Sequence, residues 1–437
     1  MTRRVIPHSE SAESVDDAQH LSGRIYSTGF GIAVRTGHPQ SQDDDAEAGV
    51  KKVFYTIVTT KLLIPGDGEP IKDAALVVKN KIIDWVGRQA DLPNEYTEKP
   101  HKLHNVPYLM PGLWDCHVHF AGSNGEREAE EGSTGLSFLA DHPTTAGARL
   151  ARGCWDAIQR GYTSMRDLAG FGCEISKAIE DGIIVGPNIY SAGACLSQLA
   201  GHGDVFALPA GDALLNLGVA SVKAGQFGAG MSCLVDGVDE CRRGVRLQIR
   251  RGAKCIKVMA SGGVLSRDDN PLYAQFSREE LDTIVGTIFV GTRTIVNLLL
   301  DSKGEGMPKK MWEKAKLVGT HSLEGYKKAI KAGCTIALGT DTEPGFNMAI
   351  ELQYAVEAGM SSLEAIKAAT ANGPLTVAGQ APLTGQLKAG YEADMIGVCD
   401  NPVEDVKVLQ KKSNIGWVWK GGKLFKGPGI GPWGEEL

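Results

Sequence analysis

Residues 109–382 alternate short apolar segments with amphipathic helical ones, and this alternation limits the possible folds more than any other feature of the chain. Strand–helix alternation produces right-handed βαβ units and a parallel sheet. At this length it favours a (β/α)8 (TIM) barrel. A doubly wound α/β sheet is the alternative, but no G-x-G-x-x-G or Walker motif supports it. The expected strands are 162–165, 189–192, 255–259 and 335–338, and the expected helices are 144–160, 236–251 and 363–371.

Segments rich in β-formers flank this region on both sides. Residues 53–58, 74–78 and 82–87 read as strands with a Lys-Asn-Lys turn, and 415–419 and 423–425 read as a second hairpin around Lys-Gly-Gly. We expect a small β-sandwich domain formed from both ends of the chain. The expected parts are a disordered or loosely attached polar tail (1–50), the first part of the β-domain (51–108), the barrel (109–382), and the second β part with a C-terminal tail (383–437).

Composition excludes several classes of function. The net charge is −6 and Lys and Arg form no long basic block, so we expect no nucleic-acid partner. No apolar run approaches the ~18 residues of a membrane span, and the first residues form no apolar signal segment. The nine cysteines contain no C-x-x-C pair, which is typical of free thiols in a reducing compartment. We therefore expect a soluble cytoplasmic protein that does not bind membranes.

His117 and His119 form an H-x-H pair in the expected first strand of the barrel. Residues i and i+2 of a strand face the same side, so the two imidazoles can bind one cation. An H-x-H pair alone is weak evidence and is usually incidental. It gains weight from its position and from the scarcity of histidine, of which the chain has only ten.

Lys257 and Asp341 are two further candidates for the chemistry. Lys257 lies in a short apolar strand, where burial lowers the amine pKa and makes the neutral form accessible to carbon dioxide. The resulting carbamate is an anionic oxygen ligand, whereas the structural alternative is a lysine that extends to water. Asp341 follows the strand 335–338, at the end where barrel enzymes hold catalytic groups. It could bind a metal and move a proton, or simply cap a helix.

Three polar residues in loops are candidates for substrate binding. His202 and Asp204 lie in a glycine-rich loop after the third expected strand. Arg267 lies in the polar loop that follows Lys257 and could meet a substrate carboxylate. A purely structural turn is an equally good interpretation of the first loop.

Several motifs resemble one known family, the amidohydrolase superfamily. They are the segments 109–117, 252–263, 338–342 and 427–434. The H-x-H pair of His117 and His119, then Lys257 and Asp341, also follow the family order. Within the superfamily the chain is similar to the group of fungal ochratoxinases, Xaa-Pro dipeptidase-like and imidazolonepropionase-like enzymes. The resemblance implies that His117, His119 and Asp341 hold one zinc, with carboxylated Lys257 as the ligand that bridges two zincs in intact relatives. It also implies a small-molecule amide or dipeptide substrate and a homo-oligomer.

One part of the family pattern is missing. The second zinc of such enzymes needs two histidines, from the fifth and sixth strands, but the only histidine between Lys257 and Asp341 is His321, in a helical stretch. Those two residues are 84 positions apart, whereas four βα units of a barrel take about 125 residues. We expect that strands five and six are absent, with the break at about 285–287, and that one zinc binds. Either the sequence derives from a damaged or wrongly spliced reading of an intact gene, which we favour, or it is a real protein of reduced size that lacks these two strands.

The motifs and the resemblance lead to one main functional hypothesis. The chain is a zinc-dependent amidohydrolase that cleaves the C–N bond of an N-acyl amino acid, dipeptide or ochratoxin-like amide through metal-activated water, with Asp341 as the proton carrier. One alternative is a catalytically impaired remnant with a scaffold role only. Another is a deaminase or cyclic-amide hydrolase of the same superfamily.

Overall fold

The computed structural model of the 437-residue chain describes residues 53–123, 143–206, 208–219, 231–264, 269–284, 289–305, 307–377 and 379–437. The expected tail (1–50), the expected break (285–287) and Arg267 lie outside these residues. Within them, no helix is long and apolar enough to cross a membrane.

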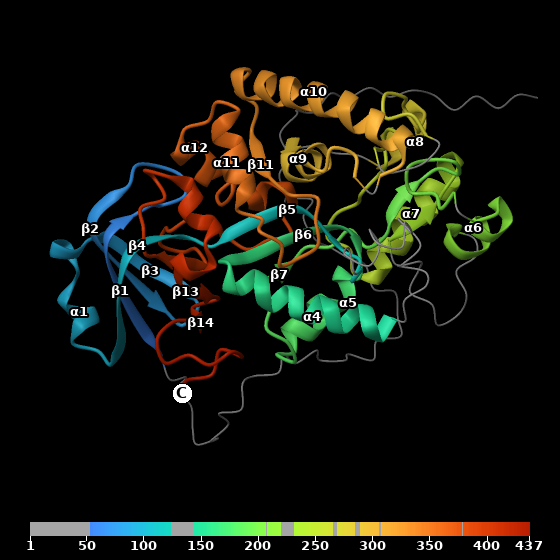
Figure 1. Ribbon diagram of the computed structural model, residues 1–437. Helices are drawn as coiled ribbons and strands as arrows, with labels where there is room; N and C mark the ends of the chain where they lie inside the picture. The colour runs from blue at the N-terminus through green and yellow to red at the C-terminus, as the bar shows by residue number, and fades with distance from the viewer. Residues whose placement is uncertain are drawn as a thin grey trace, which may run out of the picture. The chain divides into compact units, whose positions relative to one another are not determined.

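Strands from both ends of the described chain form one seven-stranded sheet, which we call the terminal sheet (Figure 1). β4 joins the two ends, since it pairs in parallel with β1 and antiparallel with β12. The sandwich form and the domain limits at 51–108, 109–382 and 383–437 stay predictions. The strands, in sheet order, are β14 (Lys423–Lys426), β13 (Ile415–Lys420), β12 (Met395–Val398), β4 (His101–Pro111), β1 (Tyr55–Leu63), β2 (Ile71–Lys79) and β3 (Ile82–Arg88).

The terminal sheet follows from ordinary β-sheet chemistry. Two of its hairpins turn where the sequence supplies residues that tolerate positive φ: Asn80 (φ 58°) between β2 and β3, and Gly421 and Gly422 between β13 and β14. Its core combines residues from both chain ends, among them Leu76 and Trp419, which are fully buried in the same cluster. The short helices η1 (Gln89–Asp91) and α1 (Asn94–Thr97) connect β3 to β4.

Parallel strands make up the middle of the chain, as the strand–helix alternation predicts. β10 pairs with β11, a parallel bridge between Val118 and Thr342 joins the end of β11 to β5, and β5 continues through β6 to β7. A separate parallel pair consists of β8 and β9. The strands are β5 (Leu113–Phe120), β6 (Tyr162–Gly170), β7 (Asn188–Ile189), β8 (Cys195–Ser197), β9 (Ser232–Leu234), β10 (Phe289–Gly291) and β11 (Ile336–Leu338).

Two of the expected strands differ from the structure. The expected strand 189–192 contains only the end of β7, because β8 turns from this sheet to pair with β9. The expected strand 255–259 is reduced to a bridge between Leu196 and Val258, although it does run beside β8: the Leu196 N–H donates to the Lys257 carbonyl at 2.8 Å, and the Met259 N–H donates to the Leu196 carbonyl at 2.9 Å. Among the described residues, no backbone pairing joins 254–259 to β10. The absence of strands five and six stays a prediction.

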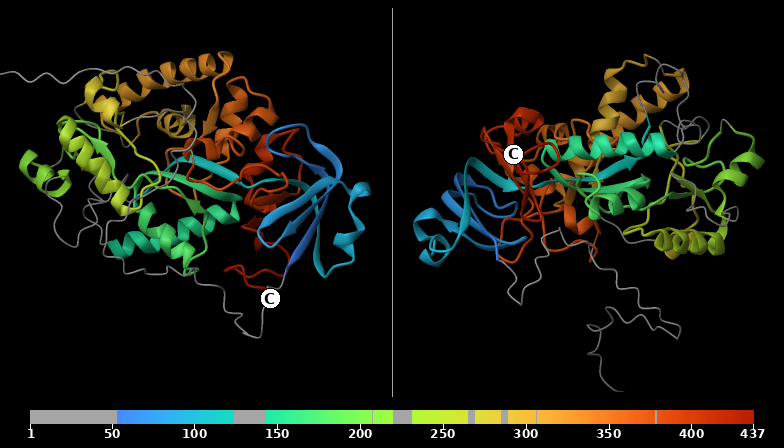
Figure 2. Two further views of the ribbon diagram at one scale, coloured as in Figure 1. Left: turned by 180° about the vertical axis from the view of Figure 1, so that it is seen from behind. Right: turned by 90° about the horizontal axis from the view of Figure 1, so that it is seen from below.

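Helices lie against these strands, and α4 covers one side of β6 and β7 (Figures 1 and 2). The three expected helices are confirmed as α4, α7 and α12, although α12 ends three residues early. A large apolar core lies between strands and helices and includes Phe120, Met165 and Leu352. The helices are α4 (Pro143–Gln159), α5 (Gly172–Glu180), α6 (Ala210–Leu217), α7 (Gly237–Arg251), α8 (Arg278–Ile284), α9 (Arg293–Asp301), α10 (Lys309–Lys331), α11 (Ile350–Glu357) and α12 (Ser362–Ala368), with 3-10 turns at Gly373–Val377, Val406–Gln410 and Lys412–Asn414.

Candidate metal centre

His117 and His119 lie on the same face of β5, as the two-residue period of a strand requires. The alternate residues Cys116, Val118 and Phe120 face the core and are fully buried, while both histidines are partly exposed. The pair therefore points away from the apolar core and toward the ends of the parallel strands.

Asp341 reaches the two histidines from the turn that follows β11. Its backbone has a positive φ of 60°, which is uncommon for a residue other than glycine but tolerated by aspartate. The turn is held because the Asp341 N–H donates to the carbonyl of His117 at 2.7 Å. Gly339 allows the close approach, since a Cβ atom there would overlap His117.

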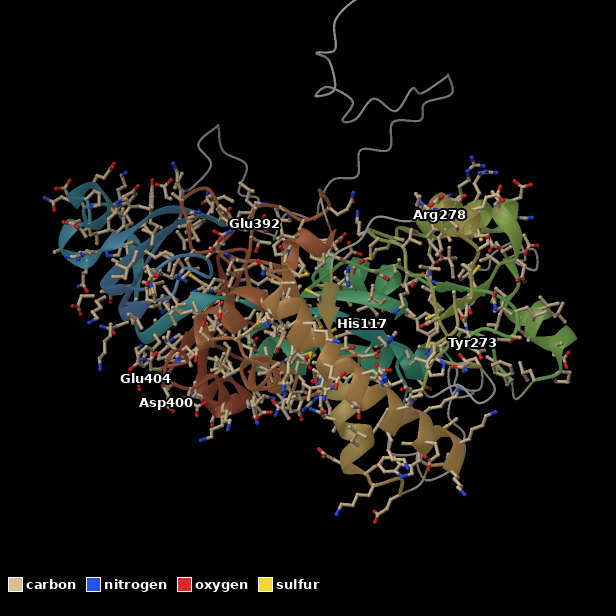
Figure 3. The ribbon with its side chains drawn as sticks, turned by 90° about the horizontal axis from the view of Figure 1, so that it is seen from above. His117, Tyr273, Arg278, Glu392, Asp400 and Glu404 are labelled. Atoms are coloured by element: carbon tan, nitrogen blue, oxygen red, sulfur yellow. The ribbon has the colours of Figure 1, made fainter. Side chains whose placement is uncertain are left out.

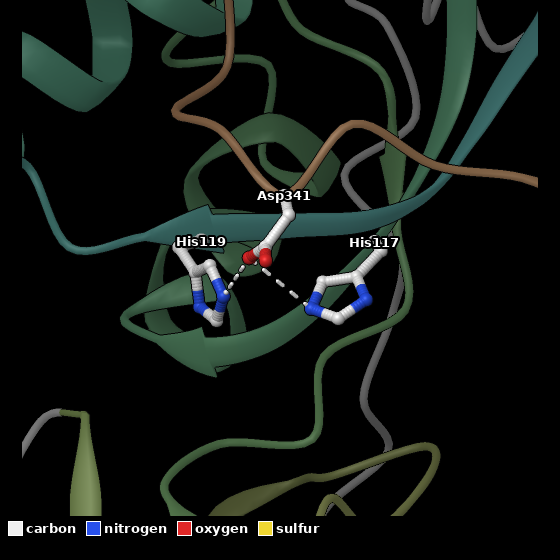
Figure 4. A group of neighbouring side chains, drawn as sticks. All are labelled: His117, His119 and Asp341. Carbon is white, nitrogen blue, oxygen red and sulfur yellow. Dashed lines mark hydrogen bonds and ion pairs between the residues drawn. The ribbon is translucent and has the colours of Figure 1, made fainter. Parts of the chain in front are cut away.

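The three side chains converge on one point (Figure 4). Ligand atoms of His117, His119 and Asp341 all lie within 4.8 Å of one another. The Asp341 Oδ1 atom is 2.8 Å from the Nε2 of His119 and 3.3 Å from the Nε2 of His117. The side chains are 15%, 19% and 31% exposed for His117, His119 and Asp341, so the cluster is sheltered but reachable from solvent.

Two buried carboxylates support the cluster, and the sequence analysis missed both. Asp115 accepts the His117 N–H at 3.0 Å and the Thr340 hydroxyl at 2.7 Å, so it ties β5 to the turn that carries Asp341. Asp167 accepts the Phe120 N–H at 3.1 Å, one residue beyond His119. In the sequence, only the position of Asp115, two residues before His117 on the same strand face, indicated that one of these carboxylates lies near the cluster.

Hydrogen bonding also orients the ring of His119. Its Nδ1 is 3.3 Å from the carbonyl of Ala169, which can only accept, so Nδ1 carries a proton. Its Nε2 lies 2.8 Å from the Asp341 Oδ1 and donates to it in the protonated ring, and the same nitrogen would face a bound metal. A histidine whose second nitrogen donates to a carbonyl is the usual arrangement for a metal ligand.

Lys257 lies next to this cluster. Its Nζ is 3.5 Å from the Nε2 of His117. Burial lowers the pKa of Lys257 from its ordinary value, despite the opposing charge of Asp341. This shift makes the neutral amine more accessible, which carboxylation requires.

The charges of the cluster are strongly coupled. Burial, together with the nearby Lys257 ammonium, holds the pKa of His117 well below its ordinary value. Burial also acts to lower the pKa of His119, but the hydrogen bond to Asp341 and its charge outweigh this effect and raise that pKa. Burial acts to raise the pKa of Asp341, yet the two histidines outweigh it and hold this pKa below its usual range. Asp341 is therefore an ionised acceptor at neutral pH.

The other candidate residues lie in different surroundings. Asp204 accepts the N–H groups of Ala200 and Val205, both at 2.7 Å, which are contacts within its own loop. His202 lies in the same loop, with its Nδ1 3.8 Å from a carboxylate oxygen of Asp269. His321 is exposed on α10, with its Nδ1 2.8 Å from the carbonyl of Leu317. Arg267 is outside the described residues.

The donor set of the cluster suits a divalent metal ion. Two imidazole nitrogens and a carboxylate oxygen, with a lysine that could become a carbamate, are ligands that zinc accepts. The structure thus contains a possible His/His/Asp metal site formed from β5 and the turn after β11.

The fold and this site define a class of enzyme, and comparison with known proteins identifies it. The amidohydrolase family model matches residues 108–290 and 292–425. The chain belongs to the amidohydrolase family.

Among individual relatives, ochratoxinase of Aspergillus niger is 54% identical to this chain over 438 aligned positions, which cover 89% of this chain and 90% of the relative. The crystal structure of that enzyme superposes with a TM-score of 0.84 at 53% identity and covers 88% of this chain and 98% of its own. Imidazolonepropionase of Cupriavidus pinatubonensis is 32% identical over 138 residues, 26% of this chain and 31% of the relative. A Xaa-Pro dipeptidase structure shares the fold at 23% identity, with a TM-score of 0.70 over 85% of this chain and 100% of its own.

Proposed function

We propose that this chain is a zinc-dependent hydrolase that cleaves the amide bond of an N-acyl amino acid, dipeptide or ochratoxin-like amide. The observation that carries the proposal is the convergence of His117, His119 and Asp341 in a chain of the amidohydrolase family. The likeness to ochratoxinase supports the same substrate class. Cytoplasmic location and homo-oligomerisation remain predictions.

The proposed roles follow from the chemistry of each side chain. His117, His119 and Asp341 would hold the zinc, and Lys257, once carboxylated, would add a fourth oxygen ligand. When bound, zinc supplies Lewis-acid polarisation of a carbonyl and lowers the pKa of a water molecule. Asp341 is the ionised base that would take the proton of the attacking water and pass it to the leaving nitrogen.

We propose one zinc per chain rather than two. The alignment with ochratoxinase has more positions than this chain has residues, although it covers only 89% of the chain. Residues of the relative therefore face gaps in this chain, in agreement with the short interval between Lys257 and Asp341. No other histidine joins the cluster among the described residues. Among the described residues, a second ion would find no protein ligand other than a carboxylated Lys257.

This ligand count keeps a second candidate function open: a catalytically impaired product of a damaged or wrongly spliced reading, with a scaffold role only. The open edge of the parallel strands between 254–259 and β10, as far as the structure describes it, favours this candidate over the deaminase or cyclic-amide hydrolase. That last alternative has no specific feature in its favour.

One experiment tests the proposal and separates it from the impaired form. The chain as written is compared with a version into which the corresponding segment of ochratoxinase is inserted between residues 284 and 289. Zinc per chain and hydrolysis of N-acyl-phenylalanine are measured for both, with His119→Ala as the control. We expect one zinc and weak turnover in the chain as written, and more of both in the restored chain. Two zincs with full turnover in the chain as written would refute the one-zinc site, and turnover in neither chain would refute the amidase function.

A further inference from the structure

A buried ion pair lies next to His202, outside the metal cluster. The Nζ of Lys314, on α10, is 2.9 Å from the Oδ1 of Asp269, and both side chains are nearly inaccessible, at 11% and 3% exposure. The Oδ2 of Asp269 accepts the Gly263 N–H at 2.7 Å and the Gln275 side-chain N–H at 3.4 Å. Asp269 is thus the centre of a polar network that joins α10 to the loop after residues 254–259.

This network also holds His202. The imidazole Nδ1 is 3.8 Å from the Oδ2 of Asp269, and the His202 backbone N–H donates to the Gln275 side-chain oxygen at 3.0 Å. The ring lies directly against Gly263, because a Cβ atom on that glycine would overlap it. Both the backbone and the ring of His202 are therefore fixed by residues of one neighbouring loop.

The loops that meet here follow neighbouring strands at the same end as the metal cluster. His202 lies five residues beyond β8, and Gly263 six residues beyond Lys257, whose carbonyl pairs with β8. Burial lowers the pKa of His202, while Asp269 opposes this shift and Lys257, Asp341 and His119 all lie close enough to influence it. Figure 3 labels His117 in the cluster and Tyr273 on the loop between Asp269 and Gln275.

A buried ion pair is a weak source of stability, because desolvation of the two charges offsets their attraction. Its best-supported role is to select one geometry over others. Lys314 follows β10 in the chain, and Asp269 follows residues 254–259, so the pair connects the two segments between which no backbone pairing is described. The geometry that it selects includes the position of His202.

We propose that Lys314, Asp269 and Gln275 are positioning residues that hold His202 as a hydrogen-bond donor to the carboxylate of the substrate. The inference rests on the proposed function and specifies its substrate as an N-acyl amino acid with a free carboxylate. Burial lowers the pKa of His202 in the free chain. A substrate carboxylate at the second nitrogen would add a negative charge to that of Asp269 and favour the protonated imidazole, which donates from both nitrogens. The ion pair with Lys314 holds the Asp269 side chain in place.

The test uses two probes that cannot be hydrolysed as amides, N-benzenesulfonyl-L-phenylalanine and its carboxamide. Their affinities for the zinc-loaded full-length chain are measured by titration calorimetry, and the ratio of acid to carboxamide affinity is the readout. A change that only loosens the structure weakens both probes alike and leaves the ratio unchanged. We expect a ratio of at least about tenfold, the strength of one charge-assisted hydrogen bond.

In His202→Ala and Lys314→Met we expect this ratio to fall severalfold toward one, whereas Lys314→Arg should keep it. The matched control is Lys316→Met, because Lys316 pairs with Glu313 at 2.8 Å on the exposed side of the same helix. If Lys314→Met does not fold, Asp269→Asn replaces it, and we expect the same fall in the affinity ratio. A ratio that is unchanged in folded Lys314→Met or Asp269→Asn overturns the inference alone. Binding of neither probe to the wild-type chain overturns the substrate class and the inference together.

Discussion

The terminal sheet and the parallel strands of the middle region differ in how completely they are paired. In the terminal sheet, β1 is paired along almost its whole length on both edges, with β2 and with β4. In the middle region, β10 and β11 pair over three residues, as do β8 and β9. Two of these short strands, β8 and β11, end at loops that carry candidate functional residues, His202 and Asp341.

This difference in pairing separates the region that provides stability from the region that carries the candidate chemistry. Long, doubly paired strands with a fully buried core open only with global unfolding, whereas short pairs with few partners open locally. The metal centre combines both situations, since β5 is long and well paired, whereas residues 255–259 pair only with β8 within the described part of the chain.

The largest expected effect is the loss of the metal site in His119→Ala. Structural zinc binding is worth ~10–16 kcal/mol, so one of four ligands contributes roughly 3 kcal/mol, or about a hundredfold in affinity. Zinc per chain, measured by mass spectrometry after dialysis, should fall close to zero. The control is His104→Ala in the terminal sheet, where the ring packs against Trp419. Equal zinc retention in both variants would remove His119 from the site.

The second effect concerns core packing, with one fully buried leucine in each region. Leu76 is buried in the terminal sheet and Leu196 in the cluster around β8 and β9. Each Leu→Ala change should cost about 2–5 kcal/mol. Hydrogen exchange should show that Leu196→Ala accelerates exchange in β8, β9 and α7 but leaves β1 and β2 unchanged, whereas Leu76→Ala lowers global stability. Exchange that rises everywhere in both variants would mean that the two regions unfold as one unit.

The third effect is a dependence of stability on pH that differs between two buried carboxyls. Burial raises the pKa of Glu351, near the parallel strands, to about 8, and that of Asp394, in the loop before β12, to about 6. A raised carboxyl pKa contributes stability at low pH that is lost as the pH rises through the folded-state pKa. Between pH 6 and 8 Glu351 contributes much more of this loss than Asp394, because Asp394 is largely ionised above pH 6. Asp115 and Glu343, whose pKa values burial raises to about 7, also contribute in this range.

Denaturant titration of the metal-free chain at pH 6 and pH 8 measures this effect. Glu351→Gln should remove roughly 2 kcal/mol of the wild-type loss between these pH values, while Asp394→Asn should remove much less. An equal change in both variants would contradict the assignment of the pH dependence to Glu351.

The smallest effect comes from two capping boxes of the same type. Ser361 and Glu364 cap α12, and Ser277 and Glu280 cap α8, with reciprocal side-chain to backbone hydrogen bonds in each. Each Ser→Ala change should cost about 1 kcal/mol of helix stability. In Ser361→Ala we expect this loss in the global free energy of unfolding. In Ser277→Ala we expect it mainly as faster hydrogen exchange in α8, and a full global loss there would contradict the local-opening view.

The sequence allowed the prediction of features that depend on local patterns. The hairpin turns at 79–81 and 421–422 follow from residues that tolerate positive φ, and the pairing of His117 with His119 follows from strand geometry. Asp341 was predictable because it follows a buried strand. Family resemblance added the order of these residues, and the family itself is confirmed.

Features that depend on residues far apart in the chain could not be predicted from sequence patterns. Nothing near Asp167 in the chain indicates that it accepts the Phe120 N–H, since the two are 47 positions apart. The strand 255–259 was overestimated because its only described neighbour, β8, is itself short and shared with β9. The ion pair of Lys314 with Asp269 joins residues 45 positions apart in different parts of the chain. From the sequence alone, each of the two would be interpreted as a charged residue exposed to solvent.

The terminal sheet has a consequence for how the protein is made. β4 aligns its end, Pro111, with Met395 of β12, which is synthesised about 280 residues later; at ~5–20 residues/s this takes roughly 14–56 s. During that time the first four strands have an unpaired edge at β4, which is a template for pairing with other nascent chains on the same message. A chain terminated before residue 395 would keep this edge open and would be prone to pair with other chains instead of completing the sheet.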